Sequence, residues 1–259
     1  MKRGFTIIEL AAILAMAAVL AICVIAPALA RTRPEVQSMQ CLANLQRMQM
    51  AWQMYGTDYN DVMMPNGVAG TAANQTWNGG SIESWYNANG NTNAAAYASS
   101  LMGRYTAGQI GVFKCPADKI PSSNGQRLRT YSMNGQMGNL YGLNTYNPGY
   151  KSYSKTTDLG GVLPPSMALI WCEENICNLN DGYLQVNNNL PDWPDVPGSY
   201  HNGAMGASFG DGHVELHAWL TPVLRIPVVF GFTASNIGTT GTNPDYAWWH
   251  QHTAAPLSP

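Results

Sequence analysis

The chain has 259 residues, enough for one good-sized domain or two small ones, and 46% of them are apolar, which is sufficient for a hydrophobic core. Its 13 Lys plus Arg are balanced by 15 Asp plus Glu. It therefore lacks the basic surface that binding to a phosphate backbone requires, and we expect no nucleic-acid partner.

A long apolar segment follows the first few residues. No residue from Leu10 to Ala30 carries a charge, and as a helix this run is about 31 Å long, close to the thickness of a bilayer core. Lys2 and Arg3 precede it, so the positive-inside rule keeps the N-terminus in the cytoplasm. The sequence therefore predicts an inner-membrane precursor with its N-terminus inside and its C-terminus outside.

A secretory signal peptide is the alternative reading of this segment. Ala28-Leu29-Ala30 is a plausible small-residue cleavage site, and cleavage after Ala30 predicts a secreted binding or adhesive protein. Two features favour the membrane anchor. The apolar run exceeds the usual h-region of about 7–15 residues, and it begins beside Glu9, an acid whose cost at such depth indicates a functional site with a partner.

The residues around Glu9 carry a specific resemblance. Gly4-Phe5-Thr6-Ile7-Ile8-Glu9-Leu10, behind a basic leader, resembles the type III signal of type IV pilins and type II secretion pseudopilins. The resemblance implies that prepilin peptidase cuts after Gly4 and methylates Phe5. It also implies that Glu9 pairs with the Phe5 amine of a neighbouring subunit during assembly, and that Pro27 is the family's helix-bending proline.

The same resemblance implies polymerisation as the mechanism. Apolar helix halves would leave the inner membrane and pack into the core of a homopolymeric helical filament, driven by a cytoplasmic ATPase and an assembly platform protein. The product would be a periplasmic or extracellular filament, either a pilus or a pseudopilus. The expected protein is a structural subunit and not an enzyme.

Apolar side chains continue at helical spacing beyond Pro34. They recur every three or four residues on one stripe of a helix that ends near Gly56, and the members of the stripe are Cys41, Leu45, Met48, Trp52 and Tyr55. Such a stripe needs a domain to pack on. The expected organisation is a leader at 1–4, a transmembrane and filament-core helix at 5–30, an amphipathic outer half at 31–57 and a loop-rich β domain at 58–259.

The rest of the chain is predicted to be loop-rich and β-structured. Asn-Gly dipeptides recur in it and tolerate the positive φ of tight turns. Residues 110–115 and 167–172 are short apolar runs that predict strands, whereas 58–105 predicts loops with one short helix. The expected fold class is α+β, in which a long N-terminal helix, transmembrane in its first half, packs on an antiparallel sheet as in the pilin fold.

Cysteine usage suits an oxidising compartment. Apart from Cys23 in the apolar run, the chain has four cysteines, which allow three pairings. We expect one disulfide between Cys41 and Cys115 and a second between Cys172 and Cys177, which would close a very short loop. Free thiols at Cys172 and Cys177 are the alternative, because sequence does not fix connectivity.

A second resemblance lies near the C-terminus. His201, nine further residues and then Asp211-Gly212-His213 resemble the C-terminal signature of a large family of bacterial pilin-like proteins. The same family is resembled by the stretch Arg47 to Asp58, with Cys41 and Asn44-Leu45 before it and Lys114-Cys115-Pro116-Ala117-Asp118 after it. The loops between these segments are unmatched.

The C-terminal segment predicts a β-hairpin. Residues 204–209 would lead in, 210–212 would turn and 213–219 would return. On the returning strand we expect Val214, Leu216 and Ala218 to face the core. We also expect His201 and Asp211 to hydrogen-bond across the hairpin.

Two kinds of chemistry compete with a purely structural interpretation. Residues 206–210 match the G-x-S-x-G motif around Ser208, but a nucleophile elbow needs a strand that turns into a helix, and a β-turn is expected here.

A metal site is the other candidate. His213, Glu215 and His217 share one strand face, and His201 or Asp211 would add a ligand. No cofactor is expected, and calcium is the alternative, because it would suit the hard oxygens of an acidic loop formed by Glu173, Glu174, Asn178, Asn180 and Asp181.

Overall fold

The computed structural model describes residues 6–67, 71–72, 74–139 and 146–257, and within residues 21–33 the description covers the backbone alone. The longest element is helix α1, Ile7–Asp58, with 52 residues. After it, Asn60 and Asp61 adopt φ values of 54° and 64°. This left-handed conformation, which Asn and Asp tolerate, ends the helix close to the predicted position.

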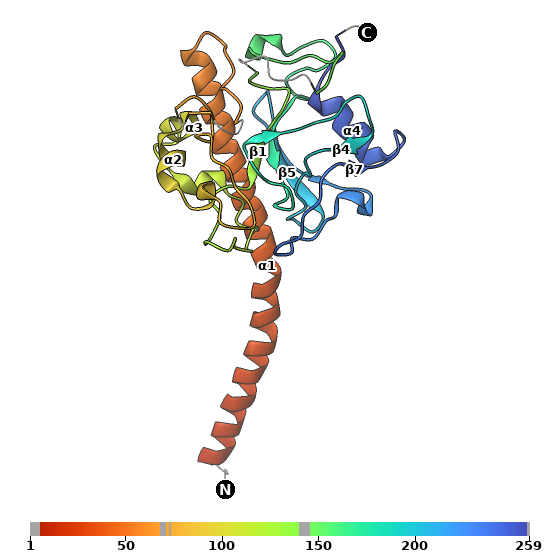
Figure 1. The fold of residues 1–259 in the computed structure, drawn as a ribbon. Coiled ribbons are helices and arrows are strands. Elements are labelled where there is room, and N and C mark those ends of the chain that lie inside the picture. The colour runs from red at the N-terminus through yellow and green to blue at the C-terminus, as the bar shows by residue number, and fades with distance from the viewer. Residues whose placement is uncertain (1–5, 68–70, 73, 140–145, 258–259) are drawn as a thin grey trace.

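Helix α1 has a projecting part and a packed part. Figure 1 shows that α1 runs along the globular part of the molecule and then continues beyond it toward the N-terminus. The side chains of residues 6–20 are all exposed. Burial begins at Cys41, and the predicted stripe is confirmed because all its members are buried: Cys41, Leu45, Met48, Trp52 and Tyr55.

The expected membrane anchor is not supported. No helix in the described part of the chain is both long enough and apolar enough to cross a bilayer. The prediction of an inner-membrane precursor with a transmembrane first half of the helix is therefore wrong.

A five-stranded sheet lies beside α1. Its order is β3-β1-β2-β5-β6, formed by Tyr183–Leu184, Tyr131–Asn134, Leu169–Glu173, Ala204–Phe209 and Val214–Ala218. Neighbouring strands are antiparallel except β1 and β3, which are parallel. Strands β4, Asp192–Trp193, and β7, Ile237–Gly238, form a separate antiparallel pair. The fold is mixed α+β with a mostly antiparallel sheet, as the sequence predicts at this level.

Both faces of the sheet are covered. On β5, Gly206 and Ser208 face α1, whereas Met205, Ala207 and Phe209 belong to a second core that includes Trp249. Trp249 lies on α4, Pro244–Thr253, whose N-terminus is capped by Asn243. The C-terminal region therefore packs on the sheet opposite α1 (Figure 1).

Short helical segments lie between α1 and β1 in the sequence. They are η1, Asn89–Asn91, α2, Ala94–Ser99, α3, Leu101–Tyr105, and η2, Ile110–Phe113. Figure 1 shows α2 and α3 on the side of α1 away from the sheet. The strand predicted at 110–115 is wrong, because the run forms η2 instead. Phe113 packs there against the rings of Trp77 and Tyr97, and a short apolar run satisfies either a helical turn or a strand equally well.

The predicted hairpin is confirmed, with one difference in how it is covered. Strand β5 pairs with β6 in the expected register, from Ala204 opposite Ala218 to Ser208 opposite Val214. The core was expected on the face of Val214, Leu216 and Ala218, but Ala218 is exposed and the opposite face, which carries His217, is also covered. The His217 ring stacks on Trp248 of α4 at 3.6 Å between centroids, and burial lowers its pKa to about 4.

Candidate functional sites

The projecting part of α1 is the first candidate site. Its large apolar side chains are widely exposed, from 88% at Ile7 to 62% at Leu14 and 66% at Leu20. They point in all directions around the helix, because every described side chain from Thr6 to Leu20 is exposed. An apolar surface of this extent is typical of a contact surface between molecules.

Glu9 caps this helix end. The Thr6 backbone N–H donates to Glu9 Oε2 at 2.8 Å, the Thr6 hydroxyl donates to the same oxygen at 2.9 Å, and the Glu9 N–H donates back to Thr6 Oγ1 at 3.3 Å. The bonds from the Thr6 backbone and side chain lower the pKa of Glu9. This arrangement is a capping box, and it places a carboxylate at the positive end of the helix dipole.

The other predicted processing and assembly residues are only partly placed. The predicted leader, which ends at Gly4, and the predicted first mature residue, Phe5, lie outside the described residues. At Pro27 the backbone is helical and continuous with the rest of α1. Cleavage after Ala30, the alternative reading, would cut this helix within its length.

A buried group of four residues is the second candidate site, and we call it the thiol–imidazole cluster: Cys41, Cys115, Glu173 and His201. One ligand atom from each lies within 4.8 Å of the others. The Cys41 thiol donates to Glu173 Oε1 at 3.2 Å, and His201 Nε2 lies 3.0 Å from the same oxygen and 3.4 Å from Cys115 Sγ. Four separate segments therefore meet here: α1, the loop after η2, β2 and the loop before β5.

Further contacts orient the members of the cluster. His201 Nδ1 lies 3.0 Å from the Ser38 hydroxyl, and Ser38 in turn donates to the carbonyl of Pro34. The second oxygen of Glu173 accepts the Gly206 N–H at 2.8 Å. The thiols also accept hydrogen bonds, from the Tyr131 hydroxyl to Cys41 Sγ at 3.2 Å and from the Ala117 N–H to Cys115 Sγ at 3.3 Å.

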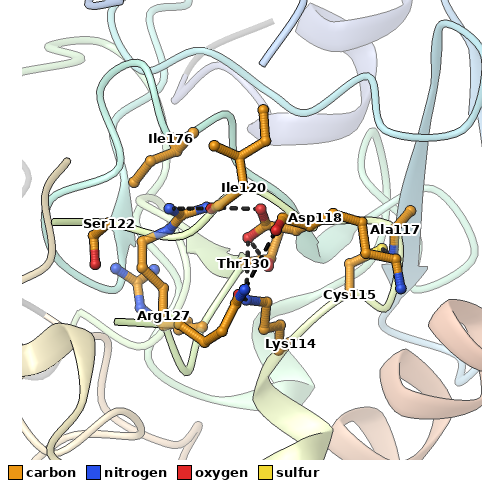
Figure 2. Close-up of polar contacts among 12 residues, drawn as sticks. Lys114, Cys115, Ala117, Asp118, Ile120, Ser122, Arg127, Thr130 and Ile176 are labelled. Carbon is orange, nitrogen blue, oxygen red and sulfur yellow. Dashed lines mark hydrogen bonds and ion pairs between the residues drawn. The ribbon is translucent and has the colours of Figure 1, made fainter. Parts of the chain in front are cut away.

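Asp118 anchors the loop that carries Cys115. Figure 2 shows its carboxylate between the side chains of Arg127, Thr130 and Lys114. Arg127 donates to Asp118 Oδ1 at 2.7 Å and Thr130 to Oδ2 at 2.9 Å, while Lys114 Nζ lies 3.9 Å away. Arg127 and Asp118 are both almost fully buried. The Lys-Cys-Pro-Ala-Asp segment therefore has a structural explanation, since its aspartate fixes the position of its cysteine.

The surroundings set the protonation of the cluster. The hydrogen bond with Cys115 lowers the pKa of Cys41, but burial and the nearby charge of Glu173 outweigh it, and the net pKa is raised. Burial raises the pKa of Cys115 as well. Burial lowers the pKa of His201, yet its contacts with Cys115 and Glu173 outweigh this and raise the pKa to about 10. The thiols are therefore protonated at neutral pH, and His201 pairs as a cation with Glu173.

The four described cysteines are all buried and free. Cys41 and Cys115, which we expect to form one disulfide, are neighbours in the thiol–imidazole cluster. Cys172 and Cys177, the second expected pair, belong to the core on the opposite face of the sheet. Among the described residues, neither expected pair is joined by a disulfide.

The predicted contact between His201 and Asp211 is not formed. His201 turns toward Glu173, and Asp211 Oδ1 instead contacts His213 Nδ1 at 2.6 Å within the turn. His217 packs on Trp248, away from this pair. The candidate metal ligands proposed around this hairpin, which also include Glu215 on β6, therefore do not come together in one site among the described residues.

The predicted calcium loop is also divided. Glu173 joins the thiol–imidazole cluster, whereas Glu174 accepts a hydrogen bond from Ser132. Asn178 donates to Asp195 at 2.9 Å, and Asp181 accepts the Tyr183 N–H at 3.0 Å. Asn180 uses its side chain to accept the Asp181 N–H. Among the described residues, the thiol–imidazole cluster is the sole group of three or more such side chains placed closely enough to hold an ion.

Ser208 has no catalytic surroundings. Its hydroxyl donates to Gln49 Oε1 at 3.2 Å, beneath α1, and the residue is fully buried. The segment that follows is a turn and a strand, as expected from the sequence.

Sequence reasoning identified all four members of the thiol–imidazole cluster, but assigned them to three different features. Cys41 and Cys115 were expected in a disulfide, His201 in a hairpin contact and Glu173 in a calcium loop. Three of the members, Cys41, Cys115 and His201, lie in segments that carry the second resemblance, whereas Glu173 lies outside those segments. Comparison with family models, curated proteins and solved structures finds no match to this chain.

Proposed function

We propose that this protein is the structural subunit of a type IV pilus-like or type II secretion pseudopilus filament that polymerises through its N-terminal helix. The observation that carries the proposal is the projecting part of α1, in which exposed side chains from Thr6 to Leu20 are mostly apolar. Exposed apolar surface costs about 25 cal/mol per Å² relative to burial. A contact that covers this helix is therefore favourable.

A second copy of the same chain is the partner that fits. The projecting helix is apolar on all sides, so it gains most from neighbours on all sides, and a bundle of identical helices supplies them. Repeated contacts between different surfaces of identical subunits generate an open helical filament when the rotation from one subunit to the next does not close into a ring. The arrangement of a long helix over an antiparallel sheet and the Gly4 to Leu10 motif support the same proposal.

Processing would prepare the helix for assembly. Cleavage by prepilin peptidase after Gly4 would create an amine at Phe5, four residues before Glu9 in the exposed first turn of α1. The Glu9 carboxylate of one subunit would then pair with the Phe5 amine of the next. An assembly platform protein and a cytoplasmic ATPase are the further partners that this proposal requires.

The N-terminus of the mature protein tests the processing. We expect mass spectrometry of the filament fraction, from cells that make the protein, to identify a methylated Phe5. A chain that begins at Arg31 would contradict the proposal and would establish a secreted protein with a conventional signal peptide.

A matched pair of substitutions tests the assembly surface. Leu14 on the projecting helix and Leu190 on the globular part are exposed to nearly the same extent, 62% and 60%. We expect Leu14→Glu to abolish filaments in electron micrographs, because it buries a charge between helices, and Leu190→Glu to leave them intact. Equal assembly of both variants would overturn the proposal.

A further inference from the structure

We propose that the thiol–imidazole cluster binds one zinc ion, which joins α1 to the sheet. Two sulfurs, one imidazole nitrogen and one carboxylate oxygen are a ligand set that zinc accepts in a closed, four-coordinate structural site. All four groups are almost entirely removed from solvent: Cys41, Cys115 and Glu173 are at 0%, and the His201 side chain is 3% exposed.

The spacing of the cluster fits a tetrahedral ion. With zinc–ligand distances of about 2.3 Å to sulfur and about 2.0–2.2 Å to nitrogen or oxygen, adjacent ligands lie about 3.5 Å apart for sulfur with nitrogen or oxygen and about 3.4 Å apart for nitrogen with oxygen. For sulfur with nitrogen, Cys115 Sγ lies 3.4 Å from His201 Nε2, and for sulfur with oxygen, Cys41 Sγ lies 3.2 Å from Glu173 Oε1. For nitrogen with oxygen, His201 Nε2 lies 3.0 Å from Glu173 Oε1. An expansion of at most about 0.4 Å between any of these pairs admits the ion.

The outer contacts hold His201 in the orientation that a metal requires. The Ser38 hydroxyl donates its proton to the Pro34 carbonyl at 2.9 Å, so it accepts the N–H of His201 Nδ1. In the neutral ring, Nε2 then carries the lone pair, and Nε2 is the atom that faces the thiols and the carboxylate. An imidazole fixed by a hydrogen bond at its other nitrogen is the usual support of a histidine ligand.

The sulfur and carboxylate ligands have comparable support. The Ala117 N–H reaches Cys115 Sγ, the Tyr131 hydroxyl reaches Cys41 Sγ, and the Gly206 N–H holds the second oxygen of Glu173. Binding releases one proton from each thiol and one from the His201 cation. Zinc with two thiolates and one carboxylate leaves a net charge of −1, which these donors stabilise.

The ion has a route into the site. A surface cavity of about 400 Å³ lies between α1 and the loop before β5 and is lined by Ser38, Leu42, Ala117 and His201. His201 therefore forms the boundary between this cavity and the buried thiols. The proposal is independent of filament assembly, because the cluster lies wholly within the packed part of one chain.

Zinc content of the purified full chain tests the proposal. We expect about one zinc per chain by elemental analysis after purification without chelators, and loss of that zinc in Cys115→Ser and His201→Gln. Cys172→Ser is the matched control, since this buried cysteine lies on the opposite face of the sheet. It should retain the metal. Ser38→Ala should weaken zinc binding by about 10–100-fold in competition with a chromophoric chelator.

A spectroscopic measurement covers the case in which a ligand variant does not fold. We expect the reduced wild-type chain, loaded with cobalt(II) in place of zinc, to show thiolate-to-cobalt charge transfer with tetrahedral ligand-field bands. A Cys41–Cys115 cross-linked peptide from the native protein would overturn the proposal and establish a disulfide instead. The proposal would also be overturned if the folded, reduced wild-type chain bound zinc no more tightly than Cys115→Ser. A cobalt spectrum typical of a site without sulfur ligands would overturn it as well.

Discussion

Asp118 is a single carboxylate on which the position of a whole loop depends. It holds Arg127 at 2.7 Å and Thr130 at 2.9 Å, and both members of the ion pair are buried. We expect Asp118→Asn to reduce the free energy of unfolding by about 3–5 kcal/mol, because it leaves the Arg127 charge buried without its partner. Denaturant unfolding measures this loss.

An exposed aspartate supplies the comparison for this prediction. Asp61 has a φ of 64°, which asparagine adopts equally well, and its side chain is exposed. We therefore expect Asp61→Asn to change the free energy of unfolding by less than about 0.5 kcal/mol. Similar losses in the two variants would show that the buried ion pair contributes little.

Asp195 makes stability depend on pH. Burial raises its pKa to about 7, against an ordinary value of 3.8, although the hydrogen bond from the Gln185 N–H opposes the shift. The folded state therefore keeps a proton that the unfolded state releases, and this contribution to stability declines as pH rises from about 4 to about 7.

Asparagine at this position removes the titration. Relative to Asp195→Asn, we expect the wild type to lose on the order of a few kcal/mol of unfolding free energy between pH 4 and pH 7. Urea unfolding of both proteins across this range measures the difference. A constant difference would mean that Asp195 has similar pKa values in the folded and unfolded chains.

At the scale of elements, the close contact between α1 and β5 depends on Gly206. A Cβ atom at this position would lie 2.9 Å from Cys41 Sγ and 2.9 Å from Leu45 Cδ1. We expect Gly206→Ala to destabilise the fold by about 1–3 kcal/mol through overpacking, as measured by thermal unfolding. Gly238→Ala is the control, because a Cβ there meets no atom within 4 Å. Equal melting temperatures for the two variants would contradict the close packing.

Sequence reasoning succeeded for elements whose pattern is local. The stripe from Cys41 to Tyr55 predicted the packed face of α1 because helical spacing repeats over several turns. The β5–β6 hairpin was predictable because its turn and both strands are contiguous.

Local patterns did not reveal what covers each element. Gln49 lies off the predicted stripe but is buried, because β5 brings Ser208 beneath it. His217 stacks on Trp248, which follows it by about thirty residues. The thiol–imidazole cluster likewise joins residues from four distant segments, and no spacing along the chain indicates that they meet.

At the scale of the whole molecule, the two parts of α1 differ in how they are stabilised. Its N-terminal part has no described tertiary contact, whereas the part from Cys41 to Tyr55 packs on the core. A helix without packing is marginal in water. In the monomer, we expect amides of residues 10–20 to exchange hydrogen rapidly and those of residues 45–55 to exchange only on global unfolding.

Hydrogen exchange followed by mass spectrometry measures both segments in one sample, so the packed segment is the internal control. In filaments, the proposed helix bundle should slow the exchange of residues 10–20 toward that of the packed segment. Equal protection of both segments in the monomer would show that the projecting helix is stabilised without any partner.

The course of α1 determines where a force applied to its N-terminal end first reaches the domain. Figure 1 shows that α1 continues beyond the globular part toward the N-terminus. Among its described side chains, the first to hydrogen-bond with another segment are Ser38, which contacts His201 in the loop before β5, and Cys41, which contacts Glu173 on β2. A force applied to the N-terminal end would be transmitted along the helix axis and would reach the domain first at these residues. In the proposed filament, tension along α1 would therefore load the thiol–imidazole cluster first, and α1 would have to shear past β2 and β5 before the rest of the core carries the force.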